Sequence, residues 1–217
     1  MKRNIFIVGG IAVVVIAAFW IMLSTTEGFF EVKLPVMSYV QPFSFVDQNG
    51  KEVTQNSFDG KVYVADYFFT TCKGICPKMN ANMQTVYEKY KNEKDFAILS
   101  HTSMPETDSV PVMKEYEEKI VGKNPNFAAD WYFVTGSKDS LYKMARQSYL
   151  LDNHQNNYTN IEDEFIHTQF FALVDRQKRV RGIYDGLVLE DITRLNKDIK
   201  ELLAEPIEKE NVKTAGK

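Results

Sequence analysis

The chain contains few cysteines and histidines, and it has no excess of basic residues. Its 217 residues include two Cys and three His, and its formal net charge is −3 at pH 7. A chain with this charge gives no indication of nucleic-acid binding. Two cysteines are also too few for iron–sulfur clusters, which usually take four. The remaining composition, with 44% hydrophobic and 25% charged residues, is that of an ordinary globular protein.

The N-terminal segment lacks charge over a long run. Residues 5–23 contain no charged residue, and Lys2 and Arg3 precede them. A helix of this length is about what a bilayer requires, and the basic flank is expected to stay in the cytoplasm. A cleaved signal peptide is the alternative, but the run is longer than a usual signal core and no A-x-A site follows it. We therefore predict a single-pass anchor at residues 1–24 in the cell inner membrane, with the following domain on the periplasmic (extracytoplasmic) side.

The remainder of the chain is predicted to form one domain. Residues 25–35 are a predicted linker, residues 36–205 the domain and residues 206–217 a polar tail. The predicted elements are a hairpin over 43–54, strands near 62–69, 96–100 and 131–135, helices near 77–91, 111–120 and 139–147, a hairpin over 168–184 and a helix over 189–202. Because strands alternate with helices, we predict an α/β fold with a central sheet covered on both faces.

Both cysteines lie at the junction between a predicted strand and a predicted helix. The apolar strand ends near Phe69, Cys72 and Cys76 follow it, and Pro77 suits the first helical position because it has no N–H. The positive field of a helix N-terminus favours thiolate, the form that attacks disulfides and binds metals. A structural disulfide is the alternative, but so short a loop would gain little from closure. We therefore predict a chemically active pair.

Two thiolates on one helical turn favour a soft metal ion. Thiolates select Cu(I), zinc or iron–sulfur clusters, and closed zinc sites usually take four protein ligands. An imidazole is a suitable third ligand here, which makes copper the better fit. Of the three histidines, His101 is predicted just past the second strand, His154 lies in a polar loop, and His167 begins an apolar run.

The motif Cys72-x-x-x-Cys76-Pro77, with His167 far downstream at the start of a strand, resembles the Sco/SenC family of copper proteins. The resemblance covers residues 36–203. It implies a thioredoxin-like fold in which Cys72, Cys76 and His167 bind one copper ion, as Cu(I) and also as Cu(II). It further implies a metallochaperone that delivers copper to subunit II of cytochrome c oxidase or to another copper acceptor.

The chain departs from the family pattern after the second predicted strand. The family usually has Asp-Pro-Glu-Arg-Asp-Thr there, whereas this chain has Met104-Pro-Glu-Thr-Asp-Ser109. His101 and Met104 could supply an auxiliary copper contact, since imidazole and thioether both suit copper. The alternative, which we favour, is that both residues only orient their neighbours.

A thiol–disulfide oxidoreductase that reduces cysteines of exported proteins is the second function considered. Cys72, the more exposed residue, would attack, and Cys76 would resolve the mixed disulfide as the second member of a redox-active pair. Thioredoxin-type enzymes typically use CxxC, so the CxxxC spacing and the distant histidine favour metal. His167 discriminates the two functions, because copper retention needs it and thiol exchange does not.

Overall fold

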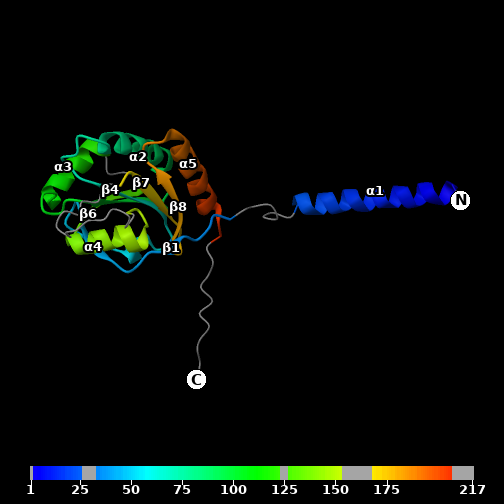
Figure 1. The fold of residues 1–217 in the computed structure, drawn as a ribbon, viewed down its shortest axis with the longest axis horizontal. Helices are drawn as coiled ribbons and strands as arrows, with labels where there is room; N and C mark the ends of the chain where they lie inside the picture. The colour runs from blue at the N-terminus through cyan, green and yellow to red at the C-terminus, as the bar shows by residue number, and fades with distance from the viewer. Residues whose placement is uncertain (1, 26–32, 123–126, 153–167, 207–217) are drawn as a thin grey trace, which may run out of the picture. The chain divides into compact units, whose positions relative to one another are not determined.

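The chain divides into two compact units, residues 1–34 and residues 35–217. The computed structural model describes residues 2–25, 33–122, 127–152 and 168–206 (Figure 1). In the first unit, helix α1 (Lys2–Thr25) covers the residues predicted to form the anchor. Within the described part of the chain, no helix combines the length and the apolar character needed to cross a membrane. The anchor and the predicted domain limits stay predictions.

An eight-stranded mixed sheet forms the centre of the second unit, in the order β1-β8-β7-β4-β5-β6-β2-β3 over the described residues. The strands are β1 (Ser38–Tyr39), β2 (Ser44–Asp47), β3 (Glu52–Thr54), β4 (Val62–Phe68), β5 (Phe96–Thr102), β6 (Asp130–Thr135), β7 (Phe170–Val174) and β8 (Arg179–Asp185). The central strands β4, β5 and β6 are parallel, and β7 runs antiparallel to β4. The carboxyl ends of β4 and β5 therefore lie at the same end of the sheet, beside the start of β7.

Helices cover both faces of this sheet, as the sequence predicts (Figure 1). The helical elements are α2 (Cys76–Tyr90), α3 (Val110–Ile120), α4 (Lys138–Lys143) and α5 (Leu189–Ala204), with a 3-10 turn η1 (Gln55–Phe58) and a π-helical turn η2 (Met144–Ser148). Helices α2, α3 and α5 lie on one face, and α4 lies on the other. Because successive side chains of a strand point to opposite faces, adjacent residues of β4 face different sets of helices.

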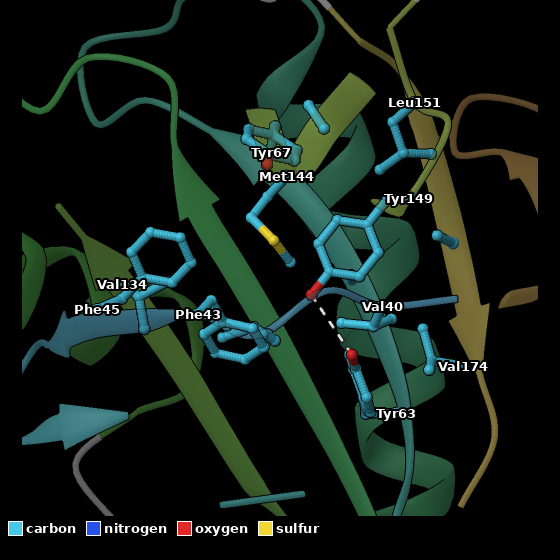
Figure 2. Close-up of a cluster of buried hydrophobic side chains, with 14 of the residues drawn as sticks. Val40, Phe43, Phe45, Tyr63, Tyr67, Val134, Met144, Tyr149, Leu151 and Val174 are labelled. Atoms are coloured by element: carbon cyan, nitrogen blue, oxygen red, sulfur yellow. Dashed lines mark hydrogen bonds between the residues drawn. The ribbon is translucent and has the colours of Figure 1, made fainter. Parts of the chain in front are cut away.

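The face under α4 and η2 holds an aromatic core. Figure 2 shows Tyr63 and Tyr67 of β4 directed into this core with Met144 and Tyr149, and the Tyr63 and Tyr149 hydroxyls are 3.4 Å apart. All four side chains are buried. Tyr67 also donates its hydroxyl to the carbonyl of Leu141 at 2.6 Å, which attaches α4 to the sheet.

Most predicted elements are confirmed, and two differences affect the analysis of the site. Strand β5 continues to Thr102, so the prediction that His101 lies past the end of the strand is wrong. The helix predicted over 139–147 is divided into α4 and the π-helical turn η2. The prediction of an α/β sheet flanked by helices is confirmed.

Candidate functional site

The two cysteines follow the carboxyl end of β4. Cys72 lies in the connecting loop, where its N–H donates to the carbonyl of Phe69 at 3.2 Å, and Cys76 is the first residue of α2, with Pro77 in the first turn. Both are free thiols, Cys72 half-buried and Cys76 buried. A hydrogen bond between the two side chains contributes to the pKa of Cys76. The two thiols are therefore close enough to share a hydrogen bond, and Cys72 is the more exposed of the two.

Burial controls the protonation of Cys76. It raises the pKa of the Cys76 thiol well above its usual value, and the neighbouring Cys72 raises it further, while a backbone hydrogen bond with Phe69 acts in the opposite direction. The expectation that the helix N-terminus makes this cysteine a thiolate is wrong for Cys76, because desolvation outweighs the helix field. A bound soft cation would supply the missing positive charge, since a coordinating thiol is deprotonated outright. Two adjacent sulfur donors fit such an ion.

The third predicted ligand lies outside the described residues. His167 belongs to the range 153–167, as does His154. Among the residues that the structure does describe, no three His, Cys, Asp or Glu side chains gather into a group able to hold a metal ion. The cysteine pair would therefore need a further ligand, and the assignment of His167 stays a prediction.

His101 is buried on the opposite face of the sheet from α2. Its ring stacks on Tyr67, with centroids 4.9 Å apart, and meets Phe45 edge-on at 5.5 Å. Burial lowers the pKa of His101 to about 4, so the imidazole is neutral near pH 7. Its Nδ1 lies 3.2 Å from the carbonyl of Asp66, and its Nε2 has no hydrogen-bond partner among the described residues. The structure does not bring His101 to the cysteines.

Met104 lies in the turn that follows β5. It is half-buried, and its N–H donates to the Thr102 hydroxyl at 2.9 Å. No hydrogen bond described for this part of the chain joins Met104 or His101 to either cysteine. The auxiliary copper contact from His101 and Met104 stays a prediction, and their observed contacts favour the alternative that they orient neighbouring groups.

Asp108 is a site residue that the sequence analysis missed. Its carboxylate is fully buried and accepts hydrogen bonds from the Thr70 hydroxyl at 2.6 Å and from the Thr102 hydroxyl at 2.5 Å. Thr70 lies in the loop that carries Cys72, and Thr102 ends β5. Asp108 thus clamps the cysteine loop to the neighbouring strand. The sequence offered one indication of this role: Asp108 keeps the second aspartate of the family pattern although other positions of Met104–Ser109 differ from it.

Asp66 lies in β4 on the same face as α2 and is almost fully buried. The Ser100 hydroxyl donates to its carboxyl group at 2.5 Å, and the Trp131 indole N–H donates to that hydroxyl at 2.9 Å. Burial raises the pKa of Asp66 to about 7. When ionised, Asp66 also raises the pKa of Cys76, so the proton on the carboxyl group and the proton on the thiol are linked.

Comparison with known proteins gives consistent matches over the second unit. The sequence model of the SCO1/SenC family matches residues 33–204. The SCO1 protein homolog of Bacillus subtilis (strain 168) is 32% identical over 174 residues, which cover 78% of this chain and 86% of the homolog.

Solved structures of the same fold agree. The structure of BsSco, described as a member of the Sco family of cytochrome c oxidase assembly proteins with a disulfide switch, has a TM-score of 0.66 at 29% identity and covers 81% of this chain and 100% of its own. Bradyrhizobium japonicum ScoI with copper bound has a TM-score of 0.59 at 23% identity, covering 76% and 100%. These likenesses confirm the predicted thioredoxin-like fold.

Replacement of the Asp108 clamp should destabilise the protein. In Asp108→Ala the Thr70 and Thr102 hydroxyls lose a buried charged acceptor, so the free energy of unfolding should fall by about 2–3 kcal/mol. The matched control is Asp130→Ala, which removes a half-exposed carboxylate paired with Lys61 and should cost less than about 1 kcal/mol. Urea denaturation of both variants measures the difference, and equal losses would contradict the assigned clamp.

Asp66 should make stability depend on pH. Its folded pKa of about 7 exceeds the ordinary value of 3.8, so the folded state retains a proton that the unfolded state releases. The resulting stabilisation is complete below about pH 4 and is lost as the pH rises to 7. In Asp66→Asn this decline should disappear in urea denaturation between pH 4 and 8. Glu115→Gln, an exposed change on α3, should retain the wild-type profile. An unchanged slope in Asp66→Asn would refute the assignment.

Proposed function

The chain belongs to the SCO1/SenC family, and on that premise we propose that it is a membrane-anchored copper metallochaperone. It would bind one copper ion through Cys72, Cys76 and His167 and deliver it to the copper centre in subunit II of cytochrome c oxidase. The description of BsSco as a member of a family of cytochrome c oxidase assembly proteins supports the choice of acceptor. The copper bound to Bradyrhizobium japonicum ScoI supports the choice of metal.

The observation that carries the proposal is the pair of free thiols at the end of β4. Cys72 and Cys76 are in side-chain contact and are not joined as a disulfide. Two adjacent sulfur donors select a soft ion such as Cu(I), and one imidazole completes a three-ligand set. Because Cys72 is half-buried rather than buried, a donor group of an acceptor protein can approach the metal at this sulfur.

The proposed location follows from the N-terminal sequence. The uncharged run at residues 5–23 and the basic Lys2 and Arg3 support a retained anchor at residues 1–24, with the domain on the extracytoplasmic side. That compartment is oxidising, so the cysteine pair would alternate between a metal-binding reduced form and a disulfide. The linker at 25–35 and the tail at 206–217 complete the proposed organisation.

Thiol–disulfide exchange is the second candidate function, and the unequal exposure of the cysteines supports it. Cys72 is accessible to a substrate disulfide, and Cys76 lies behind it in side-chain contact, as a resolving thiol must. The raised pKa of Cys76 counts against rapid resolution of the mixed disulfide, since the resolving thiol also reacts as the thiolate. Copper binding is therefore the leading proposal.

Copper affinity should depend on the proposed ligands. The reduced full-length chain in detergent, titrated anaerobically with Cu(I) against a competing chelator, should hold one copper ion tightly. His167→Ala and Cys72→Ser should each weaken binding by about 100-fold or more, since loss of outer-shell partners alone costs about 10–100-fold.

His154→Ala is the matched control, because it removes a histidine outside the proposed ligand set and should leave affinity unchanged. A different pattern would favour the second candidate. If Cu(I) binding is weak and indifferent to His167, and wild type rapidly reduces a test disulfide, the chain is a thiol oxidoreductase.

A further inference from the structure

Two side chains outside the cysteine motif form a fixed pair beside it. Asn80 lies one turn after Cys76 on α2, so both side chains share a helix face. Asn80 is buried, and its amide donates to the phenolic oxygen of Tyr116 on α3 at 2.5 Å. The Tyr116 ring stacks on Phe68, the last residue of β4, with centroids 5.1 Å apart and an interplanar angle of 15°. Tyr116 is therefore held between the two elements that flank the cysteine loop.

The hydrogen bond from Asn80, one turn after Cys76, places the Tyr116 hydroxyl beside the turn of α2 that carries Cys76. Burial raises the pKa of Tyr116, the hydrogen bond from Asn80 opposes this, and negative charge on Cys76 and Cys72 raises the pKa further. Because the Asn80 amide occupies the phenolic oxygen, the O–H of Tyr116 remains available as a donor. Among the hydrogen bonds of the described residues, this O–H has no acceptor.

We propose that Tyr116, positioned by Asn80, donates its O–H to a cysteine thiolate of the loaded site and thereby favours Cu(I) over Cu(II). The inference rests on the proposed function as a copper protein. A hydrogen bond to a thiolate withdraws electron density from sulfur, and such bonds tune the potentials of copper–thiolate and iron–sulfur sites. The sulfur atoms carry more negative charge when the bound ion is Cu(I), so the donor stabilises that state more.

The start of α3, the helix that carries Tyr116, is attached to the cysteine loop. Helix α3 begins at Val110, immediately after Ser109 and the buried Asp108. Asp108 holds Thr70 of the cysteine loop, so the same contacts that fix Cys72 also fix the start of the helix that carries Tyr116. The phenol and the sulfur atoms are thus held by one set of contacts, which is the preorganisation that a tuning hydrogen bond requires.

Tyr116→Phe tests the proposal because it removes the O–H and keeps the ring that stacks on Phe68. In the copper-loaded full-length chain, the ratio of Cu(I) to Cu(II) affinity should fall about tenfold, a decrease of about 59 mV in the potential. The sulfur-to-copper charge-transfer band of the Cu(II) form should move to longer wavelength. Asn80→Ala should also lower the ratio of Cu(I) to Cu(II) affinity, but by less, because the Tyr116 phenol remains and loses only the amide that positions it.

Tyr87→Phe is the matched control, because it removes a buried hydroxyl on α2 that donates to the Ala129 carbonyl instead. This variant should retain the wild-type potential and charge-transfer band. The proposal is overturned if Tyr116→Phe gives the same potential and band as Tyr87→Phe.

A metal-free readout separates this inference from the proposed function. In the reduced, copper-free chain, Tyr116→Phe should slow alkylation of the cysteines by iodoacetamide about tenfold at fixed pH, because the thiolate that reacts loses a hydrogen-bond donor. If wild type binds no copper, the proposed function fails, and the alkylation rate alone decides whether Tyr116 contacts a thiolate. Equal alkylation rates for wild type and Tyr116→Phe would then overturn the contact.

Discussion

The arrangement of the site depends on the hydrogen bonds that surround one buried carboxylate. A buried charge is costly unless it is paired or hydrogen-bonded, and Asp108 accepts bonds from Thr70 and Thr102. These bonds join the loop after β4 to the end of β5 and precede the start of α3. The backbone hydrogen bond of Cys72 itself, from its N–H to the carbonyl of Phe69, stays within the loop and does not attach the loop to the sheet. The clamp therefore gives the cysteine loop a tertiary attachment to the neighbouring strand.

The alternation of side chains along the central strands separates two chemical environments. Asp66 and Ser100 lie on the face covered by α2, where a polar network reaches Trp131. Tyr67 and His101 lie on the other face, within an aromatic core. The sheet thus keeps the titrating carboxyl group of Asp66 on the side of Cys76 and an imidazole that is neutral near pH 7 on the far side. Neighbouring residues in the sequence, such as Asp66 and Tyr67, have unrelated roles for this reason.

The sequence predicts the location of the cysteine pair well, because an apolar strand before it and Pro77 after it are strong local signals. It predicts the protonation of Cys76 wrongly, because the effect of a helix terminus is local whereas burial depends on the whole fold. The sequence marks Asp108 only as an aspartate retained in a divergent segment, and its contact with Thr70 could not be predicted because the two residues are 38 positions apart. The π-helical end of α4 was likewise missed, because it leaves the apolar spacing of a helix almost unchanged.

The unequal exposure of the two sulfur atoms would impose an order on copper transfer. On the proposed function, an incoming donor would approach the metal from the side of the half-buried Cys72, so the bond to that sulfur would exchange first. The bond to the buried Cys76 would break later, after the acceptor had bound the ion. At no stage would the ion be released into solution between the two proteins. An oxidising compartment would then encounter the ion only while it is bound.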